Sequence, residues 1–242
     1  MNKTREYDFT IVVPVYNEED NLDRVEKALS HYLTNCTLSA CVLLVNDGSR
    51  DSSLEKIKAI CGRHPDFFYI SSSANHGLST AIKAGINTAE SKYLGYIDAD
   101  LQTNPEDFNL LLAHIADYDI VTGIRAKRQD SVFKKLQSKI GNGFRRSMTG
   151  DTATDTGCPL KVMRTDMAKR IPFFDGMHRF LPALFSLEGG RFMELPVRHY
   201  PRTAGVSKYH LWNRLVGPFK DCFAYRWMKA RYIRYNIDEK KL

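Results

Sequence analysis

The sequence predicts an α/β protein with a mainly parallel β-sheet that is covered by helices on both faces. Five short apolar segments alternate with helix-like segments over the first 125 residues, and the connections between them are short. This alternation is typical of open parallel sheets with crossover helices. Polar and acidic residues follow three of the apolar segments, at the sheet edge where such folds bind ligands.

Each apolar segment is a candidate strand because it is short and is followed by turn residues or by the start of a helix. The predicted strands are 9–15, 40–45, 67–71, 93–97 and 119–123. The predicted helices between them begin mostly with acidic or capping residues and span 17–31, 51–61, 79–90 and 104–116.

The alternation ends after Gly123. Residues 127–148 are basic and predict a helix, residues 151–161 predict a loop, and residues 193–200 predict a late strand. No repeat or linker separates these elements from the first five strands. We therefore expect one domain over residues 1–210.

The tail, residues 211–242, is predicted to be helical and amphipathic, with a break into two helices at Gly217-Pro218. Its apolar residues fall near one helix face: Trp212, Leu215, Phe219, Cys222, Phe223, Trp227, Ala230 and Ile233. Basic residues flank that face, which is typical of a helix that lies in a membrane interface. The alternative is a helix packed on the domain, and one helix could do both.

Composition limits where the protein is expected to act. The chain has 242 residues, 43% of them hydrophobic, without the apolar run of about 20 residues that a spanning helix needs. The amino-terminal residues lead into the first strand without a signal-peptide pattern, so a cytoplasmic protein is expected. The five cysteines are scattered without a CxxC pair, which predicts free thiols in a reducing compartment: Cys36, Cys41, Cys61, Cys158 and Cys222.

Charge is divided unequally along the chain. Residues 1–124 hold 10 basic and 18 acidic residues, a net charge of −8, whereas residues 125–242 hold 25 and 10, a net charge of +15. A basic half of this kind predicts contact with a polyanion or an anionic membrane surface. Candidate lipid-facing residues are Lys134, Lys135, Lys139, Arg145 and Arg146.

Two carboxylates, Asp98 and Asp100, follow the fourth predicted strand, and Gln102 comes two residues later. Hard divalent cations prefer oxygen ligands, and Mg²⁺ typically binds one or two carboxylates together with substrate phosphates. The Asp98-Ala99-Asp100 motif therefore predicts a site for a metal-bridged phosphate compound.

Residues after the first two strands should lie at the same sheet edge as Asp100. Tyr16 could stack on a base, and Glu18 and Asp47 could accept hydrogen bonds from a base or a ribose. Each loop alone is also explained by ordinary turn chemistry, so the argument depends on their joint order.

Four motifs in this order resemble family 2 glycosyltransferases, most closely the branch of dolichyl-phosphate mannose synthases and bacterial undecaprenyl-phosphate sugar transferases. The motifs are 12–18 (VVPVYNE), 46–53 (NDGSRDSS), 75–77 (NHG) with Ala81 and Gly85, and 98–106 (DADLQTNPE). The resemblance continues more sparsely through 155–161 (DTGCPLK), 178–180 (HRF) and 201–209. Residues 156–159 (TGCP) depart from the Ser-Gly-Phe that many relatives carry, and Cys158 is interpreted as a packing residue.

The resemblance implies a GT-A fold, which is a Rossmann-like sheet, and transfer of a sugar from a nucleotide-diphosphate donor (UDP- or GDP-sugar) to a polyprenyl phosphate, with inversion. It implies that Pro14, Tyr16, Glu18, Asp47 and Asp98 bind the donor, and that Asp98, Asp100 and Gln102 hold Mg²⁺ or Mn²⁺. It further implies that Arg125, Arg202 and Lys208 bind phosphates.

A phosphate acceptor is already largely ionised near neutral pH and needs little help from a base. A hydroxyl acceptor, on a glycan or a lipid, would need one; Asp155 is then the candidate. Many members of this branch carry transmembrane helices after the catalytic domain, and this sequence shows no such apolar run. We expect the amphipathic tail to replace them and to attach the protein peripherally at the cytoplasmic membrane face. A basic nucleic-acid-binding protein and a non-catalytic scaffold are the other classes considered, and neither explains the Asp98–Gln102 motif.

Overall fold

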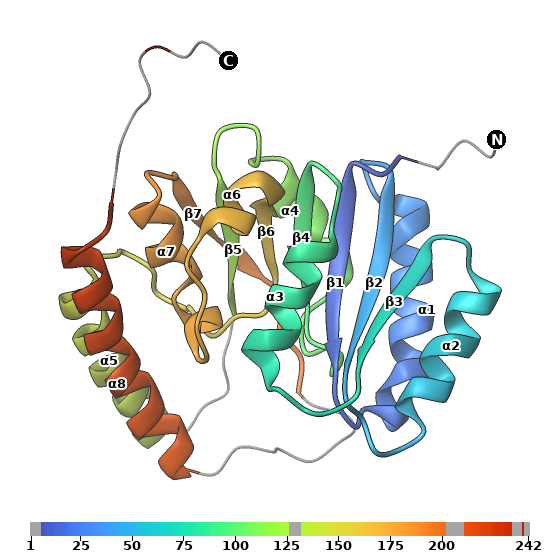
Figure 1. The fold of residues 1–242 in the computed structure, drawn as a ribbon, viewed down its shortest axis with the longest axis horizontal. Coiled ribbons are helices and arrows are strands. Elements are labelled where there is room, and N and C mark those ends of the chain that lie inside the picture. Colours follow the sequence, from blue (N-terminus) through green and yellow to red (C-terminus); the bar gives the residue numbers. More distant parts are fainter. Residues whose placement is uncertain (1–5, 126–131, 202–210, 234–238, 240–242) are drawn as a thin grey trace.

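The structure, a computed structural model, describes residues 6–125, 132–201, 211–233 and 239. A seven-stranded sheet forms its centre, with strand order β3-β2-β1-β4-β6-β5-β7 (Figure 1). The strands are β1 (Phe9–Val15), β2 (Ala40–Asp47), β3 (Phe67–Ser72), β4 (Tyr93–Tyr96), β5 (Ile120–Arg125), β6 (Lys161–Arg164) and β7 (Phe192–Val197). All neighbouring pairs are parallel except those that β6 makes with β4 and β5. The predicted mainly parallel sheet is therefore confirmed.

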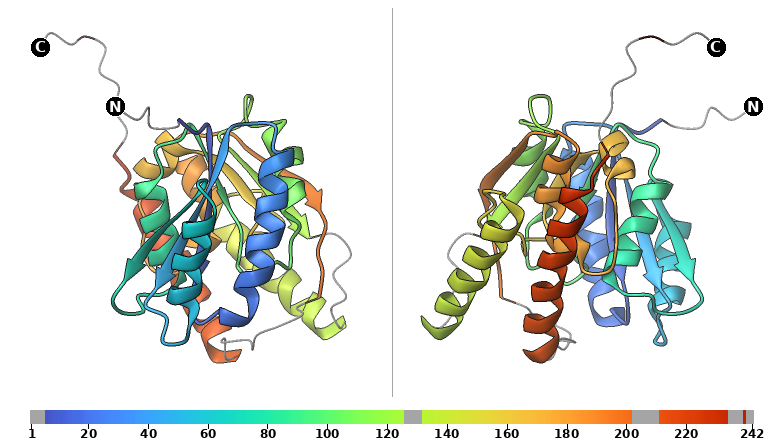
Figure 2. Two further views of the ribbon diagram at one scale, coloured as in Figure 1. Left: turned by 90° about the vertical axis from the view of Figure 1, so that its right-hand side faces the viewer. Right: turned by 60° about the vertical axis from the view of Figure 1, so that its left-hand side comes forward.

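Helices cover both faces of this sheet (Figures 1 and 2). The long ones are α1 (Glu19–Asn35), α2 (Ser53–Arg63), α3 (Leu78–Thr88), α5 (Val132–Thr149) and α8 (Leu211–Ala230). The short ones are α4 (Phe108–Leu112), α6 (Thr165–Arg170) and α7 (Leu181–Leu187), with the 3₁₀ turns η1 (Pro105–Asp107) and η2 (Met177–Arg179). The predicted helix 104–116 is thus only partly confirmed, as η1 followed by α4.

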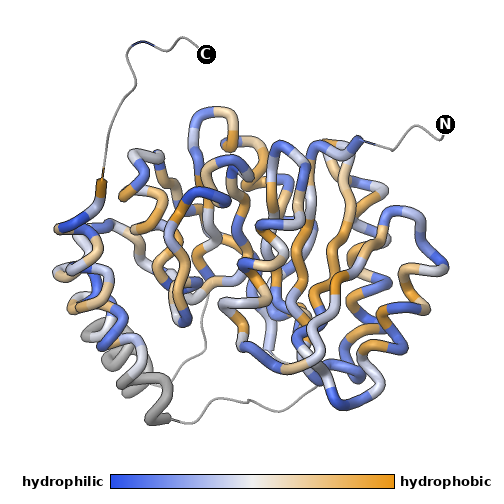
Figure 3. Tube along the Cα trace, viewed as in Figure 1, coloured by the Kyte–Doolittle hydropathy of each residue, from blue (hydrophilic) through white to orange (hydrophobic). Residues whose placement is uncertain are grey.

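Two hydrophobic clusters form the core, one on each face of the sheet. Alternate residues of β1 point to opposite faces: Ile11 and Val13 pack with α1, α2 and α4, whereas Val12 packs with α3, α6 and α7. Figure 3 shows long hydrophobic stretches along the central strands, whereas hydrophobic and hydrophilic residues alternate along the helices. Burial on both faces explains why the first strands are nearly continuous apolar runs.

Strand β6 was not predicted, because residues 151–161 were expected to be a loop and β6 begins at Lys161. The strand has four residues and starts with a lysine, so it carries no clear alternation. Because β6 runs antiparallel to its neighbours, its amino end lies at the edge where the other strands have their carboxyl ends. The turn that enters β6 therefore joins the predicted ligand edge.

The carboxyl-terminal tail forms one helix, α8, with Pro218 inside it, so the predicted break at Gly217-Pro218 is wrong. A proline removes one helical hydrogen bond, but contacts beyond it hold the helix in place. The Phe219 ring stacks on Phe144 of α5, with centroids 4.8 Å apart, and the Tyr225 hydroxyl donates to the Ala183 carbonyl at 2.9 Å. Helix α8 is therefore packed on the domain, and a membrane role for the same helix stays a prediction.

The predicted single apolar face of the tail needs a correction. Cys222 and Tyr225 of α8 are buried, whereas Phe219, Phe223 and Trp227 are half or more exposed. Residues 222 and 219 are three apart, so one faces the core and the other lies about 60° away on the helix. Helix α8 therefore has a buried stripe and a separate exposed aromatic stripe.

Candidate active site

The carboxylates of the Asp98-Ala99-Asp100 motif follow β4 directly in a tight turn. The Tyr96 hydroxyl donates to Asp98 Oδ1 at 2.6 Å, and the Gln102 amide N–H donates to Asp100 Oδ1 at 3.2 Å. Leu101 takes a left-handed backbone conformation, with φ of 48°, which closes the turn. Both side chains are thus held at the carboxyl edge of the sheet, as predicted.

The loops after β1 and β2 are fastened to each other beside this turn. The Glu18 amide N–H donates to Ser53 Oγ at 2.9 Å, and the Asn17 amide N–H donates to Ser49 Oγ at 3.0 Å. Pro14 is buried within β1, and Tyr16 and Glu18 are half-buried in the loop that follows it. The structure therefore brings the predicted donor-binding residues of these loops together at one edge.

Asp47 ends β2 and organises a third loop. Its carboxylate accepts hydrogen bonds from Asn75 Nδ2 at 2.7 Å and from the amide N–H groups of His76 at 2.9 Å and Gly77 at 2.8 Å. Gly48 has a φ of 66°, and a Cβ there would lie 2.2 Å from the Ala74 carbonyl carbon, so this close approach requires glycine. Asp47 therefore shapes the site edge in addition to its predicted role.

Arg125 and Asp155 form a two-pronged ion pair at the end of β5. Arg125 Nε and Nη2 donate to the two Asp155 oxygens at 2.8 and 2.6 Å, and the Arg125 amide N–H donates at 3.0 Å. Burial raises the pKa of Asp155, but the hydrogen bonds and charge of Arg125 outweigh it and hold the pKa below its ordinary value. Asp155 is therefore held as a carboxylate that orients Arg125.

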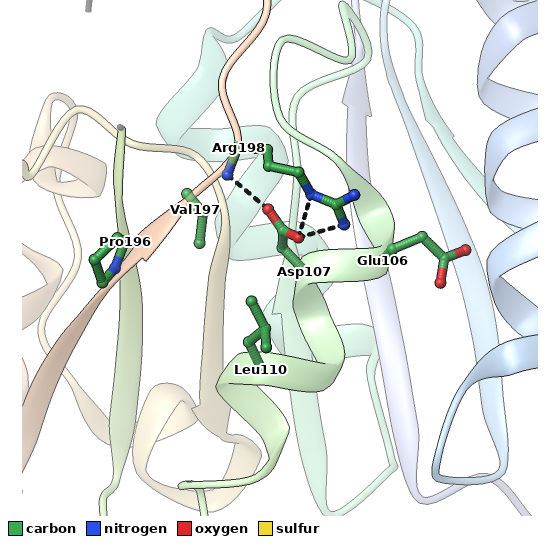
Figure 4. Close-up of a pocket in the computed structure, with 6 residues that line it drawn as sticks. All are labelled: Glu106, Asp107, Leu110, Pro196, Val197 and Arg198. Atoms are coloured by element: carbon green, nitrogen blue, oxygen red, sulfur yellow. Dashed lines mark hydrogen bonds and ion pairs between the residues drawn. The ribbon is translucent and has the colours of Figure 1, made fainter. Parts of the chain in front are cut away.

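The chain that leaves β7 is bound to the segment that follows Asp100. Arg198 donates to the buried Asp107 carboxylate through its amide N–H at 2.7 Å and through Nε at 2.8 Å (Figure 4). The Tyr200 amide N–H donates to the Gln102 carbonyl at 2.8 Å. A pocket of about 390 Å³ beside this pair is lined by Glu106, Asp107, Leu110, Pro196, Val197 and Arg198. The predicted phosphate-binding residues Arg202 and Lys208 lie outside the described residues.

Oxygen donors dominate the motif, which fits a hard divalent cation. Asp98 and Asp100 supply carboxylates, and Gln102 directs its Nε2 to the Tyr200 carbonyl at 3.4 Å, so its amide oxygen is the atom of that side chain that could bind a cation. Over the part of the chain that the structure describes, no three His, Cys, Asp or Glu side chains gather closely enough to hold a metal.

Three contributors to this site carried no predicted role. Tyr96 orients Asp98, and Lys161 donates to the Cys158 carbonyl from a fully buried position. Glu194 of β7 accepts from the Thr154 and Asp155 amide N–H groups at 2.8 and 3.1 Å. A lysine within an apolar strand was the one signal that could have indicated Lys161.

Two predictions about single residues have clear outcomes. Cys158 is fully buried in the core, which confirms it as a packing residue, and burial raises the pKa of its thiol to about 11. All five cysteines are described, and none forms a disulfide. Arg145 is wrong as a lipid-facing residue: it is buried, with an Asp151 oxygen 2.6 Å from its Nη1 atom.

Two solved glycosyltransferases share this fold. A glucosyl-3-phosphoglycerate synthase from Mycobacterium tuberculosis, in complex with Mn²⁺ and UDP-glucose, matches with a TM-score of 0.68 and 12% identity over 94% of this chain and 80% of that one. A mannosyltransferase from Pyrobaculum calidifontis, in complex with GDP-mannose and Mn²⁺, matches with a TM-score of 0.63 and 16% identity over 96% and 66%. The fold is therefore the predicted GT-A-like fold.

Sequence comparison then gives the family. Residues 10–171 match the model of the glycosyl transferase family 2, and the chain belongs to this family. An undecaprenyl-phosphate 4-deoxy-4-formamido-L-arabinose transferase of Edwardsiella ictaluri is 34% identical over 84% of the chain. A dodecaprenyl-phosphate galacturonate synthase of Rhizobium johnstonii is 32% identical over 84% of the chain. The chain spans 63% and 62% of these two relatives, less than two thirds of their length.

Proposed function

We propose that this protein transfers a sugar from a nucleotide-diphosphate donor to a polyprenyl phosphate, in a reaction that requires Mg²⁺ or Mn²⁺ and inverts the anomeric centre. One observation carries the proposal: the Asp98–Gln102 turn and the Arg125–Asp155 pair occur at one sheet edge. Carboxylates suit the metal of a donor diphosphate, and an oriented guanidinium suits a phosphate. The names of the relatives, which specify polyprenyl-phosphate products or substrates, support this acceptor class.

Departure of the nucleoside diphosphate is the step that these residues would assist. Breaking the anomeric bond leaves negative charge on the diphosphate, and a divalent metal bound there would neutralise part of that charge. Asp98, Asp100 and Gln102 would hold the metal, and Pro14, Tyr16, Glu18 and Asp47 would hold the nucleoside. Fixed cations that face developing charge are usually the largest catalytic contribution, and Arg202 and Lys208 are proposed for this role beside the diphosphate.

The state of Asp155 favours a phosphate acceptor over a hydroxyl acceptor. A general base is most effective when its pKa is near the working pH, whereas the Arg125 pair holds the pKa of Asp155 below its ordinary value against the effect of burial. A lipid phosphate carries its negative charge already and needs no base. We therefore assign Asp155 to the positioning of Arg125, which would contact the acceptor or donor phosphate.

Radiolabelled transfer tests the proposed function. Purified protein, Mn²⁺ or Mg²⁺ and a panel of UDP- and GDP-sugars are incubated with undecaprenyl phosphate, and the lipid-extractable label is measured. Matched reactions use undecaprenol, which offers a hydroxyl in place of the phosphate. We expect metal-dependent label with the phosphate only. Transfer of label to undecaprenol or to a glycan, without transfer to undecaprenyl phosphate, would contradict the proposal. It would show that the acceptor group is a hydroxyl.

We further propose that the exposed stripe of α8 rests on the cytoplasmic face of an anionic membrane, where the acceptor would lie. Phe219, Phe223 and Trp227 are 50%, 52% and 67% exposed at successive turns of the helix. Exposed cations flank them, namely Lys220, Arg226, Lys229 and Arg231. In the described part of the chain, no helix is long and apolar enough to cross a membrane. The amino ends of α5 and α8 lie on the same side of the molecule as the candidate site (Figure 1).

Replacement of Phe223 and Trp227 by serine should lower the affinity for phosphatidylglycerol-containing vesicles, measured by sedimentation, about tenfold or more. Each replacement removes the free energy gained when an exposed aromatic ring moves from water into the membrane interface. Phe68→Ser is the matched control, since Phe68 is a 44% exposed aromatic on β3. It should leave vesicle binding unchanged. Equal binding by the double variant and the wild type would leave the stripe without a membrane role.

A further inference from the structure

Lys161 is the most unusual buried residue near the candidate site. It is 1% exposed at the start of β6. Lysine is rarely buried to this extent without partners, because its ammonium loses hydration. Burial lowers the pKa of Lys161, and nearby acidic groups, which include Asp155 and Asp98, oppose this effect. Such a residue needs a structural or functional reason.

Lys161 lies in the sheet between the ends of β4 and β5 that lead into the candidate site. Lys161 pairs with Tyr96 of β4 on one side and with Thr122 of β5 on the other. Its neighbours Leu160 and Val162 belong to the cluster on the α1 face, so the Lys161 side chain lies on the opposite face together with Tyr96. Tyr96 orients Asp98 through its hydroxyl. Two buried polar groups of adjacent strands therefore support the site edge from the same face.

The Lys161 amine holds the turn that enters β6. Nζ donates to the Cys158 carbonyl and also to the Thr156 carbonyl at 3.4 Å. The same turn carries Asp155, which binds Arg125 in two-pronged fashion. A Cβ on Gly157 would lie 2.9 Å from Arg125 Nη2, so the guanidinium lies against the backbone of this turn. Displacement of the turn would therefore displace Arg125.

We propose that Lys161 is a positioning residue for sugar transfer, which fixes the 155–158 turn and through it the Arg125 guanidinium. The proposal rests on the proposed function for its effect on transfer. Because its side chain is covered, Lys161 acts through the turn and not by contact with substrate. A shift of about 1 Å in such a group can reduce a rate about 100-fold.

Lys161→Met tests the proposal, since it keeps the aliphatic length and removes the donor. Two quantities are measured: alkylation of Cys158, followed by peptide mass spectrometry, and kcat/KM for transfer. We expect Cys158 to be alkylated about fivefold faster or more. Loss of one hydrogen bond should raise the population of the opened turn, in which the thiol is accessible, by about this factor. The partly buried Cys36 and Cys61 are internal references and should react as in the wild type. We expect kcat/KM to fall about 100-fold.

A double-variant comparison separates positioning from general destabilisation. If Lys161 acts through Arg125, Lys161→Met should add less than about twofold to the loss in an Arg125→Met background. Independent losses that multiply would overturn the proposal, as would wild-type alkylation of Cys158. Lys161→Gln, which keeps a donor, should give intermediate values and replaces the methionine variant if that one does not fold.

Lys83→Met is the matched control, because Lys83 also donates to a backbone carbonyl, that of Lys169 at 3.2 Å, away from the site. It should change neither quantity. The alkylation rate of Cys158 can be measured whether or not the protein transfers sugar. If the wild type transfers no sugar, the proposed function fails, while the alkylation rate still decides whether Lys161 holds the turn.

Discussion

Replacement of Asp100 by alanine should abolish sugar transfer while the protein remains folded. Asp100 follows β4 and is half-buried at the site edge, so its loss creates no large cavity in the core. Its carboxylate is proposed to hold the metal of the donor diphosphate, and removal of such charge stabilisation costs about 1,000-fold or more in kcat. Initial rates of transfer and thermal unfolding of the same preparations measure the two effects.

Asp100→Asn distinguishes the metal role from the turn role. Asparagine keeps the Oδ1 atom that accepts from the Gln102 amide N–H, but it removes the negative charge. We expect this variant to lose transfer almost as fully as the alanine variant and to need far more Mn²⁺ for the activity that remains. Asp117→Asn, at an exposed aspartate outside the site, should behave as the wild type. Near-normal transfer by Asp100→Ala would contradict the metal-diphosphate proposal.

Replacement of Arg125 by methionine should reduce kcat/KM for transfer about 100-fold or more, because an oriented cation facing phosphate charge is removed. It should also lower the free energy of unfolding by about 3 kcal/mol, since the largely buried Asp155 carboxylate loses its partner. Chemical denaturation at neutral pH measures the second effect. Unchanged stability and unchanged transfer would mean that the pair supports neither the turn nor the phosphates.

The stability effect of Arg125→Met should depend on pH in a definite direction. The folded-state pKa of Asp155 is lowered, so the stabilisation from the pair is present above the ordinary aspartate pKa of about 3.9. It is lost as the pH falls through the lower folded-state pKa. The difference between variant and wild type should therefore be largest above about pH 5 and shrink below about pH 4. A difference that grows on acidification would contradict the ion-pair interpretation.

The sequence was most informative where long apolar runs meet turn residues. Segments such as 9–15 and 40–45 have few other stable states, and their polar ends fall at one edge once the strands are parallel. Strand β6 and helices α6 and α7 are four to seven residues long, so their patterns are too short to recognise. Tertiary packing determines these elements.

Contacts between residues far apart in the chain could not be predicted from the sequence. Asp155 pairs with Arg125 across 30 residues, which changed its proposed role from a base to a positioning group. Arg145 was indistinguishable in sequence from its exposed neighbour Arg146, yet its partner Asp151 draws it into the interior. The path of α8 past Pro218 likewise depended on aromatic contacts with α5 that no local pattern specifies.

The reversed direction of β6 separates two parts of the candidate site by their strand connections. The predicted nucleotide-binding residues leave β1, β2 and β4, whereas the 155–159 turn enters the sheet through β6. The two sets of residues therefore depend on different strand connections. Substitutions in that turn are therefore expected to shift the Arg125 guanidinium without changing the register of the strands that carry the predicted donor-binding residues.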